Sequence, residues 1–127
     1  MALKIQYCSD LHLEFYENGQ FLKANPLKSE DDILVLAGDI VLFSEMEKHQ
    51  AFFDDLSEKF KMVYWIPGNH EYYNFDAANE SGVINEQIRH NVFLVNNITI
   101  EFEKVRIIFS MLWSKISQVM KIRLLIV

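Results

Sequence analysis

The chain has 127 residues, of which half are apolar and 13% are aromatic, which is enough for one domain with a core and excludes a disordered protein. Its formal net charge of −6 argues against a general nucleic-acid or membrane-surface binder, because such proteins need basic clusters. A single cysteine, the lack of a run of about 18 apolar residues and the lack of a signal-peptide pattern favour a cytoplasmic protein without a membrane span.

Apolar runs in the first half of the chain predict three strands and one helix. Residues 3–7 form a short apolar run, and residues 33–37 form a continuous one, as expected for a strand that is covered on both faces. Residues 62–66 predict a third strand, and residues 44–60 predict a helix. The polar segment 17–32 contains two turn signals, so we expect a loop there.

Two patterns support the helix at residues 44–60. Ser44 and Glu47 match a capping box at its start. The apolar side chains that follow have helical spacing, and charged residues fill the opposite face. These apolar residues are Phe52, Phe53, Leu56 and Phe60.

The second half of the chain predicts a β-rich region. Residues 76–90 are expected to be helical in part, and three β-type runs follow at residues 92–95, 98–102 and 105–109. The apolar residues of the last stretch, 115–127, fit either a helix or a strand.

Strand, loop, strand, helix, strand is the pattern of an α/β fold that begins with parallel strands. The later runs are close together and therefore need antiparallel or edge pairing. In such sheets, ligands bind beyond the carboxyl ends of the strands. The polar motifs of this chain fall at those ends: Asp10 and His12 follow the first strand, Asp39 the second, and Asn69 and His70 the third.

These residue types suit a cation site. If the backbone is extended, Asp10 and His12 point to the same side and can bind one ion. Asp39 follows a glycine, which permits a sharp turn, and its two carboxylate oxygens allow it to bridge two ions. Asn69 offers a neutral oxygen and His70 a proton carrier. Mixed oxygen and nitrogen ligands suit Mn, Fe or Zn, and two such ions promote displacement at phosphorus.

Each motif alone has a simpler explanation. Asp-x-His and Gly-Asp are common by chance, and Gly-Asn-His-Glu also suits a loop with a helix cap. Their joint order, with each motif just past a predicted strand, favours the functional interpretation.

The neighbouring residues are interpreted more conservatively. Cys8 lacks a His/Asn partner pattern, which favours a small buried side chain over a catalytic thiol. Glu14 is expected to be a solvated loop acid. Glu71 either orients His70 or a neighbouring loop through a hydrogen bond, or acts as a cap. Tyr72 and Tyr73 are expected to pack in the core or at its rim, with lining of a substrate cleft as the alternative.

The ordered motifs resemble those of the calcineurin-like metallophosphoesterase family. The resemblance runs from about residue 3 to residue 114. The motifs that carry it are Asp10-x-His12, Gly38-Asp39 and Gly68-Asn69-His70-Glu71.

The resemblance implies an α/β fold, namely part of a two-sheet β-sandwich flanked by helices. It implies hydrolysis of phosphomonoesters or phosphodiesters at a dinuclear metal centre. Asp10 and His12 would bind the first metal, Asp39 would bridge both metals, Asn69 would bind the second, and His70 would protonate the leaving group. The implied cofactors are divalent ions, Mn first and Fe or Zn as alternatives.

The family pattern continues with a further histidine and a Gly-His-x-His element, which have no counterpart after His70. The later His90 is expected at a helix end, and His49 is expected on a helix surface. We therefore interpret residues 1–114 as the N-terminal part of a metallophosphoesterase domain and residues 115–127 as an atypical, truncated or frameshifted tail. A half-sandwich exposes an apolar face, so we expect a homo-oligomer with the tail in its interface.

Three functional hypotheses follow. The first is a metal-dependent phosphohydrolase that acts on a phosphoester, with nucleic acid involved only as a phosphodiester substrate. The second is a non-catalytic family member that oligomerises and binds at most one metal weakly. The third, a nucleotide or nucleic-acid binding module without chemistry, is disfavoured because the chain has no Walker-type glycine-rich loop.

Overall fold

The computed structural model describes residues 3–29, 32–73 and 82–112, which form two β-sheets, two α-helices and two short 3-10 helices. In chain order the elements are β1 (Ile5–Cys8), α1 (Tyr16–Ala24), β2 (Ile33–Ala37), η1 (Phe43–His49), α2 (Gln50–Lys59), β3 (Met62–Ile66), η2 (His70–Tyr72), β4 (Ile84–Arg89), β5 (Val92–Asn96), β6 (Ile98–Phe102) and β7 (Val105–Phe109).

The larger sheet has the strand order β1-β2-β3-β5-β4. The first four of these strands run parallel, and β4 pairs antiparallel with β5. In the register of the first three strands, Cys8 pairs with Leu36, and Leu36 pairs with Trp65. Strands β1, β2 and β3 therefore end at the same edge of the sheet, which confirms the α/β fold with a parallel start.

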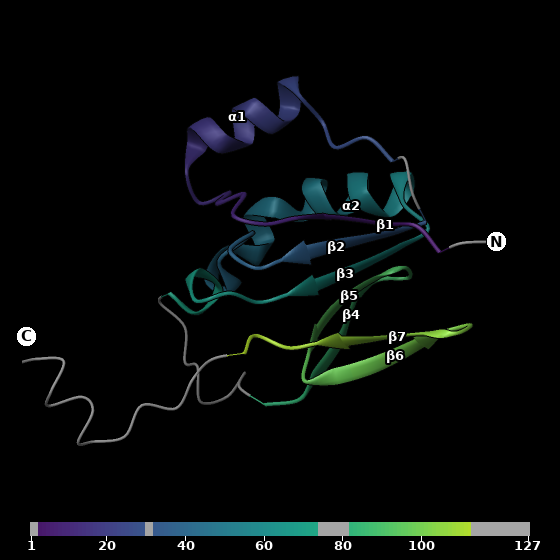
Figure 1. Ribbon diagram of the computed structural model, residues 1–127. Coiled ribbons are helices and arrows are strands. Elements are labelled where there is room, and N and C mark those ends of the chain that lie inside the picture. The colour runs from purple at the N-terminus through teal and green to yellow at the C-terminus, as the bar shows by residue number, and fades with distance from the viewer. Residues whose placement is uncertain (1–2, 30–31, 74–81, 113–127) are drawn as a thin grey trace, which may run out of the picture.

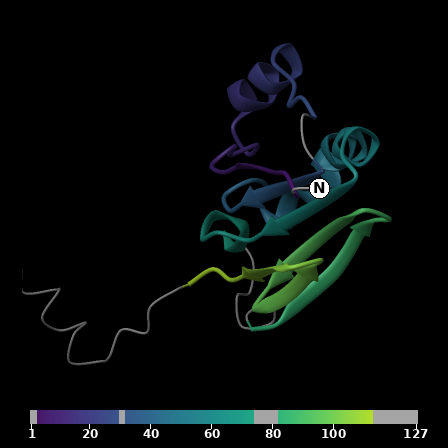
Figure 2. The same cartoon turned by 45° about the vertical axis from the view of Figure 1, so that its right-hand side comes forward.

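The molecule has three layers, with α1 and α2 on one face of the larger sheet and the β6–β7 hairpin on the other (Figures 1 and 2). Phe53 and Leu56 of α2 are fully buried, and burial of each such side chain contributes about 1.5–3 kcal/mol. They pack against a sheet face that includes Leu34 and Trp65. Tyr64 lies in the second core cluster, on the hairpin side. Because neighbouring strand residues face opposite ways, the continuous apolar run of β3 supplies both layers.

Four predicted strands have the predicted bounds, namely β2, β3, β6 and β7. The first strand lies at Ile5–Cys8, and the strand predicted from residue 92 extends to Asn96. Their apolar residues, continuous in β2 and β3 and more alternating in the later strands, were enough to define them.

The loop predicted for residues 17–32 is wrong in its first half, because the structure contains α1 there, whereas residues 25–29 lie outside any helix or strand. The turn signal at Asn18 misled the prediction. The Asn18 side chain instead donates hydrogen bonds to the carbonyl oxygens of Leu11 and His12, 3.1 Å away in each case. These bonds hold the start of α1 against the loop after β1, which local propensity alone does not reveal.

The helix expected within residues 76–90 is also wrong where the structure describes it, because residues 84–89 form β4. Its partner β5 follows in the chain, and the two strands pair from Ile84 opposite Asn96 to Arg89 opposite Val92. Pairing across the sheet decides the conformation of this polar segment. Residues 74–81 lie outside the described part.

The helix predicted for residues 44–60 is divided into η1 and α2, and the capping box is wrong. Leu42 precedes η1, and no side chain caps that end. The Ser44 hydroxyl instead donates a long bond of 3.5 Å to the carbonyl oxygen of Tyr73.

Within the described residues, no helix is both long and apolar enough to cross a bilayer. The ambiguous stretch 115–127 lies outside the described part of the chain. The predicted place of this tail in an interface therefore stays a prediction.

Candidate metal centre

The loops after β1 and β2 are held together by their backbones. The amides of Asp10, His12 and Leu13 donate to the carbonyl oxygens of Gly38, Asp39 and Ile40 at 3.0, 3.0 and 2.9 Å. The parallel pairing of the two strands thus continues past their ends. Side chains from both loops are brought to one edge of the sheet.

A buried carboxylate attaches the third loop. Glu71 is fully buried, and its Oε2 accepts hydrogen bonds from the amides of Asp39 and Gly68 at 3.0 Å each. Its Oε1 accepts from the Ile40 amide at 2.9 Å and from the Trp65 indole at 3.0 Å. Burial raises the pKa of Glu71, while the bonds from its donors oppose that shift. Of the roles considered for Glu71, the structure supports contact with a neighbouring loop.

The backbone of the site is left-handed at several residues. Asp10, His12 and Asp39 have φ values of 58°, 45° and 56°, next to Gly38 at 92°. The extended conformation expected for Asp10 and His12 is therefore wrong. A histidine in this region costs about 1–3 kcal/mol, and such strain clusters at functional sites. The strained turn still brings Asp10 Oδ1 within 3.6 Å of His12 Nε2.

Gly68 permits the close approach of the second and third loops. A Cβ atom at Gly68 would lie 2.8 Å from the Asp39 amide nitrogen and would overlap the Asp39 carboxylate. The Asp39 carboxylate also accepts a hydrogen bond from the His70 amide, at 2.9 Å to Oδ1. Only a glycine fits at this contact.

Two overlapping groups of side chains are close enough to hold a cation. Asp10, His12 and Asp39 form the first group, and His12, Glu14 and His70 form the second. Within each group, the potential ligand atoms lie within 4.8 Å of one another. The His12 and His70 rings meet edge to face, with their centroids 4.4 Å apart.

Asn69 lies on the third loop, directly before His70. It is exposed and precedes η2, and its carbonyl oxygen accepts the Tyr72 amide at 3.2 Å. The structure thus places all five predicted site residues on the three loops at one sheet edge. Their individual roles remain predictions.

Glu14 was expected to be a solvated acid, and that expectation is wrong. Its side chain is only 12% exposed, and its Oε1 lies 3.0 Å from His12 Nδ1 and 2.9 Å from His70 Nδ1. The motif pattern did not reveal the bond to His70, because it joins residues 56 positions apart in the sequence. The nearest sequence signal is that Glu14 follows His12 by two residues.

The charges of the site are coupled. Burial lowers the pKa of His12, but the hydrogen bond and charge of Glu14, together with Asp39 and Asp10, raise it above its ordinary value overall. Burial raises the pKa of Glu14, but the bonds from the two histidines bring it below its ordinary value. The site therefore has an acidic character that attracts positive charge.

The donor atoms present fit a divalent cation. Asp10, His12 and Asp39 offer carboxylate oxygens and an imidazole nitrogen, a set that suits Mn, Fe or Zn. In addition, Glu14 Oε2 is buried and accepts no hydrogen bond from the described residues. An uncompensated anionic oxygen at this depth favours a nearby positive charge.

The two tyrosines after His70 behave differently from one another. Tyr72 is buried and packs edge to face on Phe43, with 5.1 Å between the ring centroids. Tyr73 is 49% exposed, and its ring lies 4.3 Å from that of His70. Packing is thus confirmed for Tyr72, whereas Tyr73 flanks the candidate site. Cys8 is half-buried against the core, and burial raises the pKa of its thiol, which favours the packing role.

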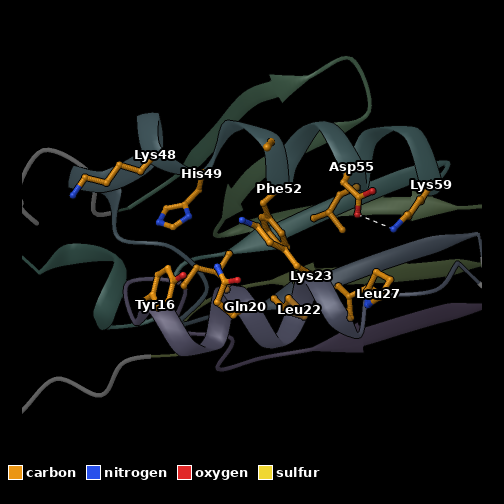
Figure 3. Close-up of a pocket in the computed structure, with 15 residues that line it drawn as sticks. Tyr16, Gln20, Leu22, Lys23, Leu27, Lys48, His49, Phe52, Asp55 and Lys59 are labelled. Atoms are coloured by element: carbon orange, nitrogen blue, oxygen red, sulfur yellow. Dashed lines mark hydrogen bonds and ion pairs between the residues drawn. The ribbon is translucent and has the colours of Figure 1, made fainter.

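The other two histidines lie apart from this site. His90 is exposed in the turn between β4 and β5, not at a helix end. His49 lines a cavity of about 570 Å³ between α1 and α2 (Figure 3), where it is half-buried and burial lowers its pKa. Phe52 and Leu22 give this cavity an apolar wall. The cavity contains none of the five predicted site residues.

A fold with helices on one face of a parallel sheet, and a carboxylate-histidine cluster at its carboxyl edge, defines a candidate metallohydrolase. The family model described as calcineurin-like phosphoesterase matches residues 3–119. The chain belongs to the calcineurin-like phosphoesterase family, as the motifs indicated. Membership of this family implies divalent metal ions.

Two curated relatives match the chain. The uncharacterized protein L509 of Acanthamoeba polyphaga mimivirus is 35% identical over 129 residues, covering 90% of this chain and 45% of the relative. The 3',5'-cyclic adenosine monophosphate phosphodiesterase CpdA of Vibrio vulnificus (strain CMCP6) is 29% identical over 84 residues, covering 56% of this chain and 31% of the relative. The chain thus spans less than half the length of either relative. No solved structure gives a significant match.

Proposed function

We propose that this chain is a metal-dependent phosphohydrolase that cleaves phosphomonoesters or phosphodiesters at a dinuclear metal centre. The observation that carries the proposal is the meeting of Asp10, His12 and Asp39, with ligand atoms within 4.8 Å, beside the His70 ring. Three separate loops supply these groups at the edge where α/β sheets bind ligands.

Each residue has a distinct part in this proposal. Asp10 and His12 would hold the first ion, Asp39 would contribute to both, and Asn69 would hold the second. Divalent ions bound there would polarise a phosphoryl oxygen and lower the pKa of water. His70 donates a proton to the leaving oxygen as its bond to phosphorus breaks.

We further propose Mn as the preferred ion, with Fe or Zn as alternatives, because imidazole and carboxylate ligands together suit these metals. The name of the Vibrio relative includes a phosphodiesterase activity, which favours a phosphodiester as the first substrate to test. Nucleic acid enters only as such a substrate, because the net charge of the chain is −6. With one cysteine and no possible internal disulfide, the chain suits the reducing cytoplasm.

The proposal is tested with a generic aryl phosphodiester in the presence and absence of Mn²⁺. Wild type should show metal-stimulated turnover, and Asp39→Asn and His70→Ala should each reduce kcat at least about 100-fold. His90→Ala, in the exposed β4–β5 turn, is the matched control and should retain full activity. Absence of metal-stimulated turnover, or turnover unaffected by both site changes, would refute the proposal.

A second candidate function is a non-catalytic family member that self-associates and binds at most one metal weakly. It is favoured by two observations on the described residues: among the five predicted site residues only Asp39 and Asn69 are assigned to a second ion, and edge strand β1 has exposed apolar residues. Tyr7 and Ile5 on that strand are 78% and 39% exposed. Metal analysis after dialysis separates the two candidates, because two tightly retained ions per chain would exclude the non-catalytic one.

A further inference from the structure

Glu14 occupies a position between the two histidines of the candidate site. A single oxygen, Oε1, is within hydrogen-bond distance of Nδ1 on both rings. The carboxylate comes from the loop after β1, as does His12, whereas His70 follows β3 and lies 56 residues further along the chain. One side chain therefore connects the first loop to the third.

The geometry determines which ring nitrogen carries hydrogen. An ionised carboxylate can only accept hydrogen bonds, so each Nδ1 must be the donor. A neutral histidine that carries hydrogen on Nδ1 has its lone pair on Nε2. In His12, Nε2 is the atom that faces Asp10, at 3.6 Å from Oδ1. The lone pair therefore points toward the Asp10–His12–Asp39 group.

The same reasoning applies to His70. With Nδ1 bonded to Glu14, Nε2 is the ring nitrogen left to take up a proton from solvent, and the protonated ring can then donate that proton to a leaving oxygen. The two rings also meet edge to face, and both contact the same carboxylate oxygen. A partner carboxylate or carbonyl commonly orients a histidine ligand in this way, but here one oxygen acts on two rings with different tasks.

The second oxygen of Glu14 has a different environment. Its Oε2 is buried and accepts no hydrogen bond from the part of the chain that the structure describes. An unsatisfied charged oxygen opposes folding, so the packing of the loop does not explain a carboxylate at this position. The two imidazole bonds to Oε1 offset this cost, because they bring the pKa of Glu14 below its ordinary value.

We propose that Glu14 is a positioning residue that holds the metal ligand His12 and the proton donor His70 in the same tautomer through one carboxylate oxygen. The proposal rests on the proposed function for the tasks of the two histidines. It goes beyond that function because the tautomers exist in the metal-free protein and can be observed without turnover.

The test uses the metal-free full chain with ¹⁵N-labelled histidine, at a pH raised until the spectra show both rings neutral, because Glu14, Asp39 and Asp10 raise the pKa of His12 above its ordinary value. Long-range ¹H–¹⁵N spectra of wild type should show hydrogen on Nδ1 of both His12 and His70. Glu14→Leu, which removes the acceptor, should shift both rings toward hydrogen on Nε2. Glu14→Gln, which keeps one acceptor oxygen, should fall between the two. Glu17→Leu, the same change at an exposed residue of α1, should match wild type.

A second measurement connects the tautomer to binding. Calorimetric titration with Mn²⁺ should show affinity lowered about 10- to 100-fold in Glu14→Leu, with partial recovery in Glu14→Gln and no change in Glu17→Leu. Wild type that carries hydrogen on Nε2 of either ring overturns the proposal, as does Glu14→Leu with both tautomers unchanged. If Glu14→Leu does not fold, wild type and Glu14→Gln decide the result. Lack of phosphoester turnover would refute the proposed function but leave the tautomer result intact.

Discussion

At the scale of single residues, Glu71 is the most interconnected side chain of the site. Its two oxygens accept four hydrogen bonds, from the amides of Asp39, Ile40 and Gly68 and from the Trp65 indole. These bonds span the loops after β2 and β3. The position of Asp39 therefore depends on a fully buried side chain.

We predict that Glu71→Gln destabilises the protein by about 3 kcal/mol or more. A glutamine has one acceptor oxygen and one amide group, so its NH₂ would face two N–H donors inside the core. The free energy of unfolding from urea denaturation measures this loss. Glu86→Gln, at an exposed position of β4, is the control and should change stability by less than about 0.5 kcal/mol. A variant as stable as wild type would show that these four bonds contribute little.

Gly68 gives a second prediction at the same scale. In Gly68→Ala the new Cβ would overlap the Asp39 carboxylate and approach the Asp39 amide. The loop must shift, at a cost of about 1–3 kcal/mol, and Mn²⁺ affinity should fall because Asp39 moves. Urea denaturation and metal titration check the two effects.

Gly19→Ala is the matched control for Gly68→Ala. Gly19 lies in α1, and a Cβ there would meet nothing within 4 Å. The helix propensity of alanine should stabilise this variant by up to about 1 kcal/mol, without any effect on metal affinity. Equal losses in both variants would mean that glycine at position 68 has no special role.

The site residues differ in how far sequence could predict them. Asp10, Asp39 and His70 stand in short motifs directly after predicted strands, so their shared edge followed from the parallel order of the sheet. The contact of Glu14 with His70 did not follow, because it joins residues 56 positions apart through side chains alone. The left-handed turn at His12 was also missed, since non-glycine residues rarely adopt it.

At the scale of elements, the strands with regular apolar runs were predictable, and those that depend on a partner were not. β2 and β3 are apolar throughout, and most of their residues are buried. β4 is largely exposed and polar, so its conformation comes from pairing with β5. α1 also depends on contacts outside itself, which is why it was not predicted. It has no buried residue, and the side-chain bonds of Asn18 hold its start.

The start of η1 provides a test at this scale. If Ser44 and Glu47 formed a capping box, Ser44→Ala would cost about 0.5–2 kcal/mol. The structure shows no side-chain cap at this end and a long 3.5 Å bond from Ser44 to Tyr73. We therefore predict a change in unfolding free energy below about 0.5 kcal/mol, measured by urea denaturation. A loss above about 1 kcal/mol would instead support a capping box formed by Ser44 and Glu47.

At the scale of the whole molecule, the larger sheet is covered unevenly. The β6–β7 hairpin packs over the second core cluster, which includes Tyr64 and Val95. β1 forms one edge of this sheet in the described part of the chain, and its Tyr7 side chain is largely exposed. An edge strand with exposed apolar side chains favours pairing with another chain, and natural proteins protect such edges with lysine.

We predict that wild type self-associates through β1 and that Tyr7→Lys shifts it toward monomer. Tyr7 is 78% exposed, so the lysine should not disturb the core, while its charge opposes pairing of two β1 edges. Light scattering coupled to size-exclusion chromatography measures the change in mass. Tyr16→Lys is the matched control, because Tyr16 is 75% exposed but lies on α1, and it should keep the wild-type mass. A monomeric wild type, or equal effects of both lysines, would place any self-association away from β1.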